Sequence, residues 1–199
     1  GIFRKNIPVI IAKQKNLTAH KTLVASAKIL KNEIINIENV SSNTTLGLRG
    51  DHQYENASTA YTAAKQILPL VSMSKTNLAL KETIWPGRVH QINHGKITNY
   101  RNNITILDGA HNVDSSYVLN QYLNKKEMGK WNLIIGMLKN RDIKDFVKIF
   151  KSHIHKVFAI SIPQAEASYS HDEIAFNLKD FGLKVHPALG LENALELAD

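Results

Sequence analysis

The segment Ile104-Thr105-Ile106-Leu107-Asp108-Gly109-Ala110-His111-Asn112 carries the clearest fold signal in the chain. Its first four residues, β-branched or apolar, predict a buried strand, and Asn112 predicts the N-cap of a following helix. Asp108, Gly109 and His111 therefore occupy the turn between the strand and the helix. In open α/β sheets ligands bind at such turns, because the strand's carboxyl end and the helix's positive N-terminus face the same crevice.

Strands and helices alternate beyond this turn. The pattern predicts helices that begin after Asn112, after Asp142 and after the capping box Ser170-His171-Asp172-Glu173, with a last helix over 191–198. Strands are predicted over 131–138, 156–162 and 183–186. This order predicts an α/β fold with a doubly wound, mostly parallel, Rossmann-like sheet. No strand follows the last helix, so we expect this domain to be truncated at its end.

The first part of the chain alternates in the same way. Strands are predicted over 7–12 and 33–37, with a helix capped by Thr18 between them. A second helix follows Gly50, and Ser74 is expected to cap a third. The Trp85-Pro86-Gly87 segment then ends the helix and redirects the chain, so we place a domain boundary there, with domains over 1–84 and 85–199.

Between this boundary and the turn at Asp108, residues 89–93 and 96–100 flank His94-Gly95 and predict a hairpin. Residues 99–103 are expected to enlarge it.

Composition limits the function. The 199 residues are 43% hydrophobic and 21% charged, enough for a core that buries roughly 70% of the unfolded surface. No long apolar run or leader pattern indicates a membrane or secretion. The absence of cysteine excludes disulfides and thiolate metal sites. The net charge of +8 comes from scattered lysines, so we expect anionic small molecules and no nucleic acid as partners.

Four motifs in order resemble those of the folylpolyglutamate synthase and dihydrofolate synthase family, which belongs to the Mur ligase superfamily. The segment 107–112 matches LDGAHN, and 50–57 is similar to G-x-H-Q-x-x-N-A. Residues 85–88 match WPGR, and 136–142 resemble GMLKDKD, with Asn140 and Arg141 as departures. Gly1 to Lys5 also resemble the end of the family's EKAGIFR segment.

The resemblance implies an architecture and a reaction. Residues 1–84 would be the C-terminal part of the central ATP-binding domain, and 85–199 the Mur ligase C-terminal domain. The family phosphorylates a carboxylate with ATP and lets the amine of L-glutamate attack the acyl phosphate; the acceptor is a folate or dihydropteroate. ATP and Mg²⁺ are the implied cofactors. We expect a cytoplasmic, monomeric full-length enzyme. We also expect the phosphate loop and the magnesium ligands to precede Gly1, so that the chain is a piece of the enzyme and inactive alone.

The same resemblance implies roles for four residues. Asn56 would hydrogen-bond the adenine of ATP, Arg88 would grip its phosphates, and Asp108 would accept the ribose hydroxyls. His111 is the candidate catalytic residue, binding the carboxylate of glutamate or orienting its amine. Structural alternatives remain open: a helix cap for Asn56, a turn or helix-entry acid for Asp108, and a backbone cap for His111.

Two further features of the sequence bear on its function. His153 and His155 have strand-like spacing, but no third ligand accompanies them, so no metal site is predicted. A non-catalytic binding module or relic from a split gene is one alternative function. A peptidoglycan Mur ligase is another, although the His52-Gln53 pair before Asn56 and the GML segment favour the folate branch.

Overall fold

The computed structural model describes residues 2–98, 103–126 and 129–198. The chain divides into two compact units, Gly1–Trp85 and Pro86–Asp199. Each unit is described by itself below. Both contain strands and helices, so the predicted α/β class is confirmed.

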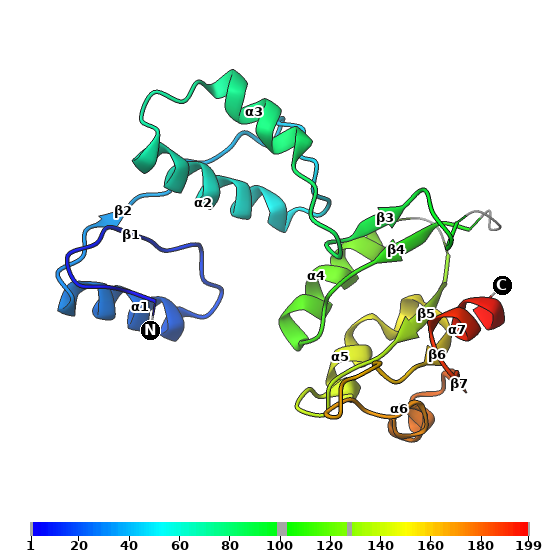
Figure 1. Ribbon diagram of the computed structural model, residues 1–199. Helices are drawn as coiled ribbons and strands as arrows, with labels where there is room; N and C mark the ends of the chain where they lie inside the picture. Colours follow the sequence, from blue (N-terminus) through cyan, green and yellow to red (C-terminus); the bar gives the residue numbers. More distant parts are fainter. Residues whose placement is uncertain (1, 99–102, 127–128, 199) are drawn as a thin grey trace. The chain divides into compact units, whose positions relative to one another are not determined.

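The first unit contains two short parallel strands and three helices. Its elements, labelled in Figure 1, are β1 (Val9–Ile10), α1 (Leu17–Ile29), β2 (Ile34–Ile35), α2 (His52–Ile67) and α3 (Met73–Glu82). Strands β1 and β2 pair in parallel, as expected from the helix that connects them. The strands are much shorter than the ranges predicted from sequence.

Two helix caps in this unit differ from the prediction. Asn16 caps α1, because its side-chain oxygen accepts hydrogen bonds from the backbone N–H groups of Thr18 and Ala19. Ser72, in place of Ser74, caps α3 and accepts from the N–H of Lys75. In both cases a cap-forming residue lies two positions earlier in extended backbone conformation, so the helix begins sooner.

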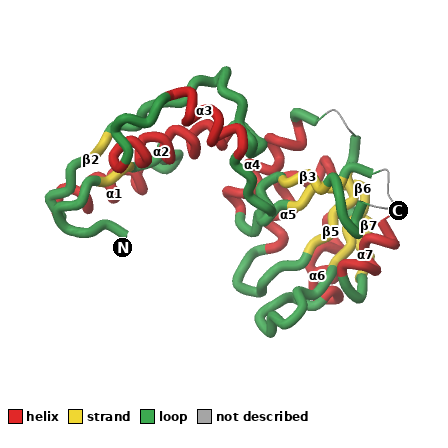
Figure 2. Tube along the Cα trace, turned by 45° about the horizontal axis from the view of Figure 1, so that its top comes forward, coloured by secondary structure: helices red, strands yellow, loops and turns green. Residues whose placement is uncertain are grey.

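The second unit holds three parallel strands and a separate antiparallel pair. Its elements are β3 (His90–Ile92), β4 (Thr105–Leu107), α4 (Val113–Asn124), β5 (Trp131–Ile135), α5 (Ile143–Phe150), η1 (Lys151–His153), β6 (Ile154–Ala159), α6 (His171–Leu178), η2 (Lys179–Phe181), β7 (Lys184–Pro187) and α7 (Leu191–Ala198). Strands β5, β6 and β7 lie side by side in that order, all parallel (Figures 1 and 2).

Strand β6 shows why helices are needed on both faces of this sheet. Val157 and Ala159 are fully buried on one face, in a cluster that also contains residues of α4, α5 and α6. Phe158 points to the opposite face, where it packs with Ala188 and with Ala194 of α7. Because neighbouring residues of a strand face opposite sides, a strand buried on both must be apolar throughout. The sheet is therefore doubly wound, as predicted.

The strand before the 108–111 turn is not part of this parallel sheet. In the described residues β4 pairs only with β3, antiparallel, with Gln91 opposite Ile106. The predicted strand is confirmed as β4, but Ile104 and Leu107 are 43% and 49% exposed, so its predicted burial is wrong. A cleft of about 810 Å³ is lined by both β4 and β5. The motif thus follows a two-stranded ribbon.

The predicted hairpin also has different partners. Strand β3 pairs with β4, and Lys96 to Thr98 form a turn in which the N–H of Thr98 donates to the carbonyl of Gly95 at 3.0 Å. The prediction of a second hairpin strand over 96–100 is therefore wrong for the described residues 96–98. The remainder of the predicted enlargement, residues 99–102, lies outside the described residues.

Candidate functional site

The carboxylate of Asp108 joins the turn to the linker that begins the second unit. Its Oδ2 accepts a hydrogen bond from the N–H of Val89 at 2.7 Å, and its Oδ1 accepts from the N–H of Ala110 at 2.8 Å. A third bond runs beside them, from the N–H of Gly109 to the carbonyl of Gly87 at 2.8 Å. The linker residues before β3 are thereby held against the turn after β4.

The backbone of this linker is strained. Val89 has φ +46° although it is β-branched, and its side chain is 3% exposed. Gly87 has φ +76°, which only glycine adopts without cost. A β-branched residue in the left-handed region is a rare and costly conformation that persists where its surroundings enforce it. Two features hold Val89 in this conformation: its side chain is buried, and its N–H donates a hydrogen bond to Asp108.

His111 is exposed at the start of α4, and its ring is fixed by its own turn. The Nδ1 atom lies 2.8 Å from the carbonyl oxygen of Gly109. A carbonyl only accepts, so Nδ1 carries the proton and Nε2 is the free acceptor of the neutral ring. The N–H groups of His111 and Asn112 both donate to Ser115 Oγ at 3.1 Å. The Asn112 cap and the helix after it are confirmed.

Arg88 lies between the two anchored residues, Gly87 and Val89. Its side chain is exposed, and within the described part of the chain its guanidinium forms no hydrogen bond or ion pair. The backbone at Arg88 is therefore positioned on both sides while its five N–H donors stay available.

Asn56 lies in the second turn of α2, in the first unit. The N-cap position belongs to Asp51, so the reading of Asn56 as a helix cap is wrong. Asn56 is exposed, and its Nδ2 donates to Gln53 Oε1 at 3.0 Å. Gln53, 4% exposed, in turn places its Nε2 3.0 Å from His52 Nε2. This chain of contacts orients the Asn56 amide, whose Oδ1 accepts no hydrogen bond from a described residue.

The ring of His52 lies close to Gly50. Gly50 has φ +104°, and a Cβ atom there would lie 2.7 Å from the His52 ring. The glycine thus makes room for the ring.

The second unit holds Arg88, Asp108 and His111, with the last two in one turn.

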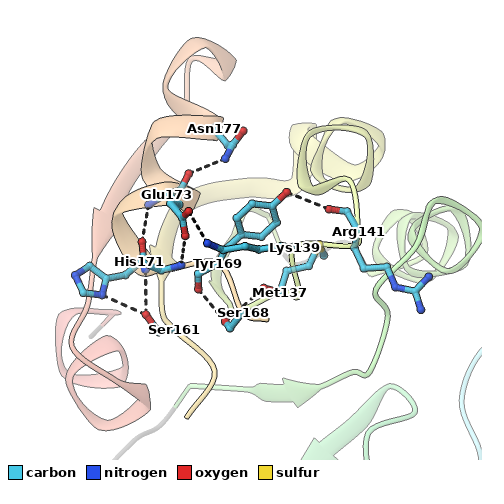
Figure 3. Close-up of polar contacts among 10 residues, drawn as sticks. Met137, Lys139, Arg141, Ser161, Ser168, Tyr169, His171, Glu173 and Asn177 are labelled. Carbon is cyan, nitrogen blue, oxygen red and sulfur yellow. Dashed lines mark hydrogen bonds and ion pairs between the residues drawn. The ribbon is translucent and has the colours of Figure 1, made fainter. Parts of the chain in front are cut away.

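An ion pair that the sequence analysis did not predict connects the loop after β5 to the predicted capping box at the start of α6. Lys139 Nζ donates to Glu173 Oε1 at 2.7 Å, a contact drawn in Figure 3, and Glu173 Oε2 accepts from the N–H of Ser170 at 2.7 Å. The hydrogen bond from Lys139, followed by that from the Ser170 backbone, lowers the pKa of Glu173 below its ordinary value. The sequence signal for this ion pair is the combination of a lysine in the 136–142 motif with the glutamate of a capping box.

The backbone of the same loop is bound to the segment before α6. The N–H of Tyr169 donates to the carbonyl of Met137 at 2.9 Å, and its hydroxyl lies 3.4 Å from the carbonyl of Arg141. A Cβ on Gly136 would lie 3.1 Å from the Ile160 carbonyl oxygen, so a larger residue there would require its neighbours to shift. Figure 3 shows the Arg141 side chain directed away from the network.

No metal site is evident. Among residues 2–98, 103–126 and 129–198, no group of three His, Asp or Glu side chains is arranged to hold a metal ion. His153 and His155 lie in η1 and β6 without a third ligand. None of the described helices is both long and apolar enough to span a bilayer.

Comparison with known proteins gives consistent matches. Residues 90–167 match the family model described as the C-terminal domain of dihydrofolate synthetase. A folylpolyglutamate synthase of Saccharomyces cerevisiae is 23% identical over 207 residues, which span 89% of this chain and 36% of that protein. The chain therefore spans about a third of the length of the curated relatives that it matches.

Two solved structures share the fold. The folylpolyglutamate synthase of Mycobacterium tuberculosis complexed with ADP has a TM-score of 0.79 at 16% identity, covering 95% of this chain and 46% of that one. The bifunctional folylpolyglutamate synthase/dihydrofolate synthase of Yersinia pestis, complexed with AMPPNP and Mn ion, has a TM-score of 0.78 at 16% identity, covering 100% and 48%. The likeness extends over both units of the chain.

Proposed function

We propose that this chain is the C-terminal portion of a member of the folylpolyglutamate synthase and dihydrofolate synthase family, and that it serves an ATP-dependent ligase. The proposed reaction adds L-glutamate to a folate or to dihydropteroate. A carboxylate first takes a phosphoryl group from ATP, and the amine of glutamate then displaces phosphate to form an amide. We place this enzyme in the cytoplasm, with small molecules as its partners.

The observation that carries the proposal is the fixed turn of Asp108 and His111. Positioning supplies much of the rate in reactions of this type, so residues that act on substrates should be held by their surroundings. Both oxygens of Asp108 accept one backbone N–H each, and each keeps a second lone pair. These are the acceptors that we assign to the ribose hydroxyls.

The other nucleotide contacts are assigned by chemistry. Arg88 offers a planar, permanently charged fork that binds phosphate oxygens in pairs. The Asn56 amide is oriented by the hydrogen bond from its nitrogen to Gln53. Its oxygen is available to accept a hydrogen bond from a donor such as the amino group of adenine. Related structures that hold ADP or AMPPNP support a nucleotide as the ligand of this family.

His111 is proposed as the residue that contacts the incoming glutamate. With Nδ1 donating to Gly109, Nε2 is placed to accept a hydrogen bond from the ammonium group or to take its proton. Mg²⁺ would neutralise the charge of the transferred phosphoryl group when bound. The described residues offer no cluster to hold that ion, so no step is assigned to metal ligands of this chain.

The test is steady-state kinetics on the complete natural protein. Arg88→Ala and Asp108→Asn should each lower kcat/KM for ATP by at least roughly tenfold, which corresponds to losing one charge-assisted hydrogen bond. His111→Ala should affect the use of glutamate more than that of ATP. His20→Ala, at an exposed histidine of α1, serves as the control and should leave both unchanged. Normal ATP kinetics in the Arg88 and Asp108 variants would refute the assignment.

A further inference from the structure

A second concave surface lies at the edge of the parallel sheet where its strands begin. It encloses about 480 Å³ and is lined by the starts of β6 and β7, the end of α5, and η1. The 136–142 motif leaves β5 at the other end of that strand. This surface lies at the opposite end of β5 from the loop that carries the motif, and it shares Lys130, Ile154 and His155 with the cleft of about 810 Å³ that Asp108 also lines.

The described ionisable side chains that line this surface are all basic. They are Lys130, Lys148, Lys151, Lys184 and His155, and we call the surface the lysine cleft. Among the residues that the structure describes, no Asp or Glu lines it. All four lysines are exposed, and none is ion-paired with a described carboxylate, in contrast to Lys65 and Lys139. The closest ring contact is that of Lys151, whose Nζ lies 5.8 Å from the ring centre of Phe181.

Favourable interaction with a helix end explains the position of only two of these four lysines. Lys148 and Lys151 lie in the last turn of α5 and in η1, where exposed carbonyls favour cations. Lys130 precedes β5 and Lys184 begins β7, where no helix end requires a cation. Like charges gathered on a concave surface repel one another and raise the local positive potential. A multivalent anion removes that repulsion when it binds.

The donor types favour phosphate. Lysine is a compact charge with three donors that suits phosphate oxygens approached from several sides. None of the described lining residues is an arginine that could pair a carboxylate in a planar fork. Ser152 adds a hydroxyl that has no hydrogen bond within the described residues. Gly182 leaves open space, since a Cβ there would meet nothing within 4 Å. We propose that the lysine cleft binds a small oligophosphate anion.

The probe is inorganic tripolyphosphate, titrated calorimetrically into the 199-residue chain. The double variant Lys151→Gln/Lys184→Gln should bind at least about tenfold more weakly than the unmodified chain, and added salt should weaken binding further. The control Lys28→Gln/Lys144→Gln removes the same charge from exposed sites outside the cleft and should bind normally. Arg88→Gln should also bind normally, which separates this site from the proposed nucleotide contacts.

Several outcomes would overturn the proposal. They are an absence of binding, an equal loss in the control variant, or a loss with Arg88→Gln alone. Citrate binding as tightly as tripolyphosphate would overturn the phosphate assignment, and tighter binding of a short single-stranded oligonucleotide would point to a nucleic-acid backbone in its place. If the double variant melts early, Lys130→Gln takes its place, and normal binding by that variant would contradict the proposal.

Discussion

The Oδ2 atom of Asp108 and the N–H of Val89, 19 residues apart in sequence, form a hydrogen bond of 2.7 Å. A side chain proposed to bind the nucleotide therefore also holds the linker that enters the second unit. The structural and the functional interpretations of Asp108 are compatible, because a carboxylate can accept more than two hydrogen bonds. Nucleotide binding at Asp108 would act on the same group that fixes the strained backbone at Val89.

Asp108→Ala should destabilise the second unit by about 1–3 kcal/mol, because two partly buried N–H groups lose their acceptor. Asp108→Asn keeps one acceptor oxygen and should cost less. Urea unfolding of the 199-residue chain, followed by circular dichroism, measures both. Asp114→Ala, at an exposed acid in the first turn of α4, is the control and should cost less than about 1 kcal/mol. Equal stability of the Asp108→Ala and unmodified chains would contradict the anchoring role.

Gly87→Ala should lower the free energy of unfolding by about 1–2 kcal/mol, since φ +76° forces a Cβ into a left-handed conformation. Gly190→Ala is the matched control, because no atom lies within 4 Å of its added Cβ and its φ is not in that region. Thermal melts of the two variants decide the point. A Gly87→Ala chain as stable as Gly190→Ala would show that the linker tolerates another conformation.

Gln53→Leu in the complete protein should raise KM for ATP by roughly threefold to tenfold, with little change in kcat. The reason is that Asn56 loses the acceptor that orients its amide, at the usual value of one hydrogen bond. Gln66→Leu, on the same helix, is the control. An unchanged KM in Gln53→Leu would indicate that Asn56 is positioned without Gln53 or does not contact the nucleotide.

The ion pair of Glu173 and Lys139 should make stability depend on pH. The pKa of Glu173 is lowered from 4.5 in the folded state, so its contribution is present above the unfolded value and is lost as the pH falls through the folded one. Glu173→Gln keeps the capping acceptor and removes the charge, so the difference in Tm from the unmodified chain should be larger at neutral pH than near pH ~3. Glu192→Gln, at another first-turn position, should show no such trend. A difference that does not vary with pH would contradict the charge effect.

The 199-residue chain alone should release no phosphate from ATP and add no glutamate. Its sequence holds no G-x-x-x-x-G-K-[ST] loop to cradle phosphates, and its described residues hold no metal cluster. A malachite-green assay and mass spectrometry of the folate product check the two activities. Phosphate release that His111→Ala abolishes would contradict the prediction.

Local signals in the sequence determined most of the second unit. The caps at Asn112, Asp142 and Ser170 were predicted because each side chain bonds an N–H only three residues ahead. The order of strands and helices from β5 to α7 followed from two signals: helices show apolar periodicity, and strands buried on both faces show continuous apolar runs. In the first unit, Asn16 and Ser72 were missed as caps because a second cap-forming residue stands two positions later, and local sequence does not rank the two.

Tertiary structure alone decided the contacts between distant segments. The pairing of β4 with β3, the bond between Asp108 and Val89, and the bond between Lys139 and Glu173 join residues from 13 to 34 positions apart. Periodicity assigns a residue to a face of its own element, but the partner across space depends on how the elements pack. These long-range hydrogen bonds form between the polar groups that packing happens to bring together. For this reason the sequence could indicate Asp108 as a site residue but could not show that it also holds the linker.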